Sequence, residues 1–226
     1  MKTTMALKPL AFALAALMAV AAQAGDYKKT SSAATVNDAQ YNHGNVVLND
    51  KTQNNASINS SFNNSSGIAG SNNAAGDNNQ GKNDVAITSG DADFVFATVN
   101  SAQANYSNLV INSGTKNNAS VNNSFNDAKG IAQSNNAAGT SNQGSNSVAI
   151  NSGDWGDGGS ATINAVQDVT GNLTVNLSTG HGWKSSPVVN NASINNSFNN
   201  SSGIVGSNNA AGSNNQGQNN VAITRF

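Results

Sequence analysis

The chain has 226 residues and a net charge of −1, contains no cysteine, and all 11 of its acidic residues are Asp. The lack of a basic surplus argues against nucleic acid as a partner, and the lack of cysteine excludes a disulfide framework. Asn is the most common residue, with 43 copies, and this composition is typical of chains that are disordered alone but prone to β assembly.

The first 24 residues have the layout of a secretory signal peptide. Lys2 and Lys8 precede an apolar run from Leu10 to Val20, and the small-x-small sequence Ala22-Gln23-Ala24 follows. The run is shorter than the roughly 20 residues that span a bilayer. We therefore predict signal peptide 1–24, cleavage between Ala24 and Gly25, secretion of the mature chain, and no membrane span in it.

Three copies of a 35-residue block follow, at 54–88, 117–151 and 190–224, and they align without a gap. The first block reads NNASINSSFNNSSGIAGSNNAAGDNNQGKNDVAIT and matches the third at 30 of 35 positions. We predict an N-terminal segment at 25–53, repeats 1, 2 and 3 at the three blocks, linker 1 at 89–116, linker 2 at 152–189, and a tail at 225–226.

The similarity extends upstream of the blocks. ATVNDAQYNHGNVVLN at Ala34–Asn49 aligns with ATVNSAQANYSNLVIN at Ala97–Asn112, at the same offset of 63 residues as the first two blocks, and Ala161–Asn176 is a weaker third version. The repeating unit is therefore longer than the block, and whether the linkers join the ordered core is left open. Extra residues around His181–Val188, including Trp183 and Pro187, predict a loop in the third copy.

The blocks predict short β-strands that stack. Apolar and polar residues alternate along Asn55–Phe62, and Gly67, Gly76 and Gly81 punctuate the block at turn-like sites. A large side chain contributes about 1.5–3 kcal/mol when buried, whereas ordering costs roughly 1–2 kcal/mol per residue. One block therefore cannot fold alone, but identical blocks can stack at about 4.7–4.8 Å.

The fold class that we predict is all-β, a three-rung β-solenoid-like cross-β stack with one rung set per repeat, largely disordered before assembly. The stacked columns of its fibril core are predicted to be Ile58, Val121 and Ile194; Phe62, Phe125 and Phe198; Ile68, Ile131 and Ile204; Asn72, Asn135 and Asn208; Gln80, Gln143 and Gln216; Val85, Val148 and Val221; and Ile87, Ile150 and Ile223. The Asn and Gln columns are candidate amide ladders.

Charge placement agrees with stacking in sequence order. Asp77, Lys82, Asp84, Asp127 and Lys129 each align with uncharged residues in the other two blocks. Like charges one rung apart repel, and in a three-rung stack each charge would meet its equal only after about 14 Å, beyond the Debye length of about 8 Å. Asp91 and Asp154 do align with each other, outside the blocks.

No motif supports catalysis or a cofactor. His43 and His181 are solitary, and the Asp-rich Gly153–Ser160 lacks the nine-residue spacing of calcium-binding β-rolls. The alternatives to a fibril subunit are a monomeric β-solenoid adhesin or ice-binding protein and a β-helical polysaccharide enzyme. Only Arg225 and Phe226 follow the third block, where a solenoid needs a polar cap, and no acidic cluster suggests an active site.

The leader and the three NNASxN–SF–GI–NNAAG–NQ–VAI blocks closely resemble the Fap functional amyloids of Pseudomonas over nearly the whole chain. The resemblance implies a secreted structural subunit that polymerises with itself into extracellular fibrils of the biofilm matrix and promotes aggregation and adhesion. It also implies a related minor fibril subunit, a periplasmic chaperone and an outer-membrane export pore as partners. The linker lengths favour the major subunit, whereas the missing Cys-x-x-Cys tail favours the minor or nucleating subunit.

Overall fold

In the computed structural model, residues 30–90, 92–153, 158–180 and 186–225 are described, and they form fifteen strands without a helix. The predicted signal peptide and its cleavage site, His181, Trp155, Trp183, Asp91 and Asp154 lie outside these residues. No helix long and apolar enough to cross a membrane occurs in the part of the chain that the structure describes.

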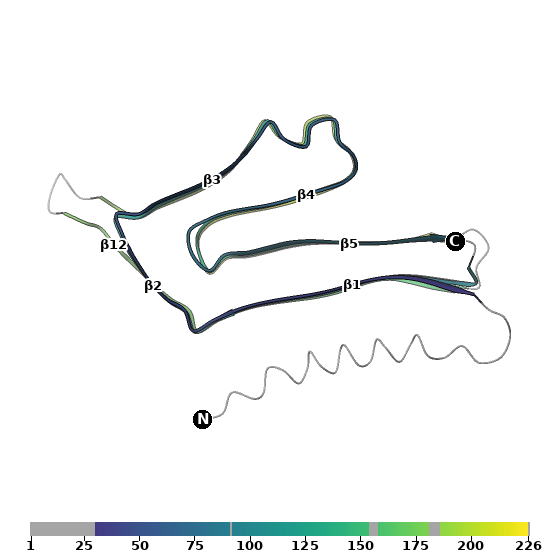
Figure 1. Ribbon diagram of the computed structural model, residues 1–226, viewed down its shortest axis with the longest axis horizontal. Coiled ribbons are helices and arrows are strands. Elements are labelled where there is room, and N and C mark those ends of the chain that lie inside the picture. Colours follow the sequence, from purple (N-terminus) through teal and green to yellow (C-terminus); the bar gives the residue numbers. More distant parts are fainter. Residues whose placement is uncertain (1–29, 91, 154–157, 181–185, 226) are drawn as a thin grey trace, which may run out of the picture.

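The chain runs three times around nearly the same path, and each circuit is called a rung below (Figure 1). Rung 1 consists of β1 (Ser31–His43), β2 (Val46–Asp50), β3 (Gln53–Asn59), β4 (Ser66–Ala75) and β5 (Gln80–Gly90). Rung 2 consists of β6 (Phe94–Tyr106), β7 (Leu109–Ser113), β8 (Lys116–Asn122), β9 (Lys129–Thr140) and β10 (Gln143–Gly153). Rung 3 consists of β11 (Gly158–Thr170), β12 (Leu173–Leu177), β13 (Val189–Asn195), β14 (Ser202–Ser213) and β15 (Gln216–Arg225).

Equivalent strands of the three rungs form five parallel three-stranded sheets, and the strand from rung 2 is central in every one. Rungs 1 and 2 pair at a constant offset of 63 residues, as Ser31 with Phe94 and Gln80 with Gln143 show. The predicted all-β solenoid-like stack in sequence order is therefore confirmed. Each block supplies three strands, such as β3, β4 and β5 in the first block.

The linker segments continue the stack, which answers the question that the sequence left open. β6 and β7 lie in linker 1, and β11 and β12 lie in linker 2. Rung 3 pairs with rung 2 at an offset of 64 up to Leu177 and of 73 from Val189 onward, so nine extra residues separate these positions. Thr179 and Ser186 form an antiparallel bridge within this insertion, at the predicted loop.

Within one rung the strands fold into four layers, in the order β3, β4, β5 and β1, and β2 joins β1 to β3 along one side (Figure 1). The space between β3 and β4, continued by β8 and β9 in rung 2, holds an apolar cluster around Val121, Phe125 and Ala132. The space between β1 and β5, continued by β6 and β10, holds another around Ala97, Val99 and Ala149. Both clusters reach across all three rungs, so stacking supplies the burial that a single block lacks.

Between β4 and β5, Asn side chains lie against Gly residues of the facing strand, where apolar side chains would pack in an ordinary core. A Cβ at Gly81 would lie 3.0 Å from Oδ1 of Asn72, and one at Gly70 would lie 3.3 Å from Nδ2 of Asn83. The missing side chains therefore let two backbones approach closely enough for Asn to bond across the gap. Asn83 Nδ2 donates to the Ser71 carbonyl at 3.0 Å and to Asn72 Oδ1 at 3.1 Å.

Candidate functional site: the two ends of the stack

The two end faces of the stack are the candidate functional site. Strands β1 to β5 at one end and β11 to β15 at the other pair along one edge only, within the residues that the structure describes. Unpaired strand edges are templates for adding further strands. Each end therefore presents five strand edges in one surface.

Asn side chains form hydrogen-bonded ladders that run to both ends. Asn73 donates to Asn136 at 2.8 Å, and Asn136 donates to Asn209 at 2.9 Å. The Asn72 column has the opposite polarity, because Asn135 donates to Asn72 at 2.8 Å and Asn208 donates to Asn135 at 2.9 Å. Every amide in a ladder can both donate and accept, so a ladder has no natural end.

The rungs are also linked by side chains that reach from one rung to the backbone of the next. Asn73 Nδ2 donates to Ala56 O of its own rung at 3.3 Å and to Ser120 O of rung 2 at 2.9 Å. Asn136 repeats this pattern with Ala119 O and Ser193 O. Within the described residues Asn209 has only Ala192 O, at 3.1 Å, so its second carbonyl would have to come from a fourth rung.

The Gln80 column repeats the pattern at a second place. Gln80 Nε2 donates to Ala104 O of rung 2, and Gln143 Nε2 donates to Asp168 O of rung 3, both at 3.2 Å. Gln216, in rung 3, forms no such bond within the described part of the chain. Rung 3 therefore ends with donors whose equivalents in rungs 1 and 2 are satisfied by the following rung.

A phenylalanine column crosses the corner between β3 and β4. Phe125 is 4.7 Å from Phe62 and 4.8 Å from Phe198 between ring centroids, with interplanar angles of 14° and 8°. All three residues have positive φ, between 58° and 61°, a conformation rare for a bulky side chain. Phe125 is 0% exposed and Phe62 is 40% exposed, so the end of the stack leaves an aromatic ring face uncovered.

A charged cluster lies between β1 and β5 in rung 1. Lys82 Nζ is 3.5 Å from Asp38 Oδ2 and donates to Asp38 O at 3.1 Å and to Ala102 O of rung 2 at 3.2 Å. Burial lowers the pKa of Lys82 and raises the pKa of Asp84, because the charged forms lose water. The nearby Ser101 side chain offsets part of the rise in the pKa of Asp84, and Asp84 Oδ2 has no hydrogen-bond partner among the described residues.

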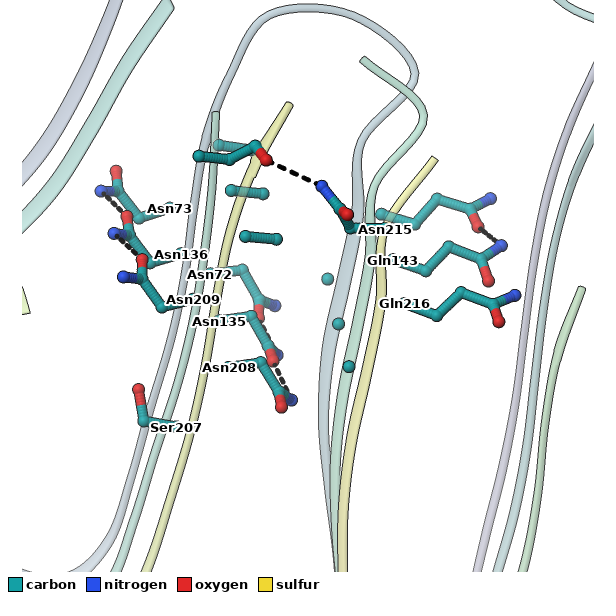
Figure 2. A pocket seen from close by; sticks show the side chains of 18 residues that line it. Asn72, Asn73, Asn135, Asn136, Gln143, Ser207, Asn208, Asn209, Asn215 and Gln216 are labelled. Carbon is teal, nitrogen blue, oxygen red and sulfur yellow. Dashed lines mark hydrogen bonds between the residues drawn. The ribbon is translucent and has the colours of Figure 1, made fainter. Parts of the chain in front are cut away.

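A cavity of about 380 Å³ runs through all three rungs between β4 and β5 and their equivalents. Figure 2 shows the Asn72, Asn135 and Asn208 ladder pointing into the space between the two sets of strands, while the Asn73 ladder points to the other side. The lining residues are all Asn, Gln, Ser, Ala or Gly. The cavity thus offers no titratable group for catalysis.

The structure brings each predicted column into register. The members are Ile58, Val121 and Ile194; Phe62, Phe125 and Phe198; Ile68, Ile131 and Ile204, and Asn72, Asn135 and Asn208; and Gln80, Gln143 and Gln216, Val85, Val148 and Val221, and Ile87, Ile150 and Ile223.

One of these columns lies on the wall of the stack instead of inside it. Ile87 is 45% exposed and Ile223 is 43% exposed, and Ile150 between them is also partly exposed. Its neighbour Ala86 takes the inner position against β1, and strand alternation turns Ile87 to the other side. The facing strand β4 begins only at Ser66, so little covers this column.

Sequence reasoning missed several ladders and the charged cluster. The missed ladders include Asn73, Asn136 and Asn209; Asn49, Asn112 and Asn176; Asn79, Asn142 and Asn215; Asn83, Asn146 and Asn219; and Gln40, Gln103 and Gln167. Identical amides at one column of all three copies were the signal that could have revealed them.

His43 packs against Tyr106, with ring centroids 4.6 Å apart. In the described ranges no three His, Cys, Asp or Glu side chains gather as metal ligands would.

Comparison with known proteins gives a consistent picture. A family model described as the functional amyloid protein FapB/FapC family matches residues 33–225. A functional amyloid subunit FapC of Pseudomonas aeruginosa is 42% identical over 195 residues, which cover 78% of this chain and 56% of that protein. The chain thus spans about half the length of this curated relative. No solved structure matches the chain.

Proposed function

The chain belongs to the functional amyloid FapB/FapC family, and we propose on that premise that it is a structural subunit of extracellular fibrils. Molecules stack end to end, with rung 1 of each molecule on rung 3 of the one before. The family is one of structural amyloid subunits, which agrees with a structural rather than a catalytic role.

The observation that carries this proposal is the likeness of the two ends. Rung 3 repeats the block of rung 1 at 30 of 35 positions, and both pair with rung 2 in one register. A second molecule can therefore place its rung 1 on rung 3 as rung 2 lies on rung 1. That contact would extend the Asn ladders, cover the phenylalanine ring face, and give Asn209 and Gln216 their missing carbonyl partners.

Assembly from purified mature chain tests the proposal. Freshly dissolved chain should be largely disordered and, after a lag, should form fibrils with a reflection at about 4.7–4.8 Å. Preformed fibrils added as seeds should shorten the lag, since open rungs template new ones. A stable, soluble, β-rich monomer that forms no fibrils over weeks, even with seeds, would contradict the proposal.

In the cell the chain would leave through the periplasm after its leader is removed and would form fibrils at the cell surface and in the biofilm matrix. There the fibrils would strengthen the matrix and promote aggregation and adhesion. A related minor subunit, a periplasmic chaperone and an outer-membrane export pore are the partners we propose. We assign the chain as the major subunit, which predicts that it is the most abundant protein in purified fibrils; a trace amount would indicate the nucleating subunit.

A further inference from the structure

Three inward-facing columns between β1 and β5 differ from rung to rung. Asp38 pairs with Ser101, which pairs with Ala165. The other two columns are Lys82, Ser145 and Gln218, and Asp84, Ser147 and Asn220. Rung 1 is therefore charged at this place, rung 2 carries three serines, and rung 3 carries two amides and an alanine.

In rung 1, the Lys82 and Asp84 side chains of these columns reach toward rung 2. Lys82 of rung 1 donates to Ala102 O of rung 2, and the Asp84 side chain of rung 1 faces the Ser101 side chain of rung 2, which affects its pKa. Rung 2 has no equivalent of the second contact, because Ser147 would face Ala165, which has no polar side-chain atom. The contact from β5 to the next rung is thus different at each step of the stack.

Rung 3 is the last rung of the molecule, so the corresponding contact from β15 would be made with rung 1 of the next molecule. Asn220 occupies the column of Asp84, so its neighbour in the following rung is the column of Ser101, which in the next molecule is Asp38. We infer that the Asn220 amide of one molecule donates a hydrogen bond to the Asp38 carboxylate of the next, and that this pair specifies the joint between molecules. The inference rests on the end-to-end stacking proposed above.

The surroundings of Asp38 fit this role. Its side chain is 36% exposed in the single molecule, whereas Lys82 beside it is 2% exposed. The next molecule would cover a carboxylate that already has its countercharge, and a neutral amide satisfies the remaining oxygen without adding a charge. Gln218, in the column of Lys82, would donate in the same way to the Ala39 carbonyl of the next molecule.

The charged cluster of rung 1 also disfavours a different packing of the same chain. If whole molecules lay flat and stacked copy upon copy, Asp38 would lie on Asp38 and Asp84 on Asp84 at about 4.8 Å. Buried like charges at that spacing are strongly unfavourable. In the three-rung stack each of these charges recurs only after about 14 Å, at three rungs. The cluster therefore selects the end-to-end order.

The test is seeded elongation of four full-length mature chains, each on its own seeds at low salt: wild type, Asn220→Asp, the double variant Asp38→Asn with Asn220→Asp, and Ser160→Asp. Asn220→Asp sets two carboxylates against each other at every joint and should slow elongation roughly tenfold. The double variant restores one amide and one carboxylate at each joint and should elongate clearly faster than Asn220→Asp. Recovery should be partial, because Asp38→Asn also removes the carboxylate that pairs with Lys82.

Ser160→Asp is the matched control, since it adds the same charge to rung 3 at an exposed position in the column of Ala33 and Phe96. It should elongate like wild type. Equal rates for Asn220→Asp and Ser160→Asp, or a double variant as slow as the single one, would overturn the pairing while fibril formation stands. Failure of the wild type to form fibrils would instead overturn the proposed function.

Discussion

Phe62 and Phe125 stack with ring centroids 4.7 Å apart, yet they differ in exposure, at 40% and 0%. The difference arises only because Phe62 belongs to an end rung. In the proposed fibril, Phe198 in rung 3 of the neighbouring molecule would cover the free face of Phe62, as Phe62 covers one face of Phe125. The two rings would then be equivalent.

Alanine substitutions at the three phenylalanines are therefore expected to have equal effects in a fibril, although Phe62 and Phe125 differ in exposure in the single molecule. In fibrils Phe62→Ala, Phe125→Ala and Phe198→Ala should each lower stability by a similar amount, about 3–5 kcal/mol, as expected for a buried phenylalanine. The backbone conformation is the same at all three sites, so any strain on alanine cancels in the comparison. Denaturant midpoints of the fibrils measure the effect, and a clearly milder Phe62→Ala would argue against contact between ends.

A column of like charges tests the register of the stack. Ser66, Lys129 and Ser202 form one exposed column, which suits the test better than the Asp77 column, because Thr140 there is fully buried. Changing Ser66 and Ser202 to Lys places three ammonium groups about 4.8 Å apart, with a repulsion of roughly 1 kcal/mol per pair in water. Assembly should slow and the fibril denaturant midpoint should fall.

The control for the lysine column carries the same two added charges in two different columns, at the exposed positions Thr35 and Asn191. It should assemble at close to the wild-type rate. In about 1 M salt the Debye length falls to about 3 Å, so the two variants should converge. Identical lag times and midpoints at low salt would mean that equivalent residues of the three copies do not lie on one another.

Buried Asp84 makes fibril stability depend on pH. Burial raises the pKa of its carboxyl above the ordinary value of 3.8, so the folded chain holds this proton more tightly than the unfolded chain. The contribution of Asp84 to stability is therefore complete below 3.8 and is lost as pH rises through its folded pKa. Lys82 has a lowered pKa, so its own contribution increases only as pH rises.

Asp84→Asn isolates this effect, because asparagine does not titrate. At pH 7 the variant should have a higher fibril denaturant midpoint than wild type, and the difference should shrink as the pH approaches 3.8. A difference that stays constant over this range would show that the carboxyl is not desolvated in the fibril.

Much of the fold follows from the repeats. The constant offset of 63 residues determines the order and the pairing of rungs 1 and 2, and it is enough by itself to predict that Phe62 lies on Phe125. The path within a rung does not follow, because it depends on corners such as Ser60, Phe62 and Asn64, where non-glycine residues have positive φ. Local propensity does not predict that conformation for phenylalanine.

The charged cluster was also beyond sequence reasoning, for a related reason. Lys82 lies in the first block and Asp38 lies upstream of it, and only the turn of β5 onto β1 brings them within 3.5 Å. The alternation along β5 likewise determines that Ala86 faces inward and Ile87 outward, a choice that the hydrophobicity of Ile87 alone would reverse. Contacts between layers require the path of the chain as well as its repeats.

The axial repeat of the fibril tests the central claim most directly. If each molecule supplies three successive rungs that differ in sequence, identical rungs recur only at every third layer. Fibre diffraction or electron cryomicroscopy should show, besides the reflection at about 4.8 Å, an axial repeat of three rungs at about 14 Å. The mass per length should correspond to one molecule for each such repeat. A repeat of about 4.8 Å alone, with one molecule in every layer and three times the mass per length, would contradict the account.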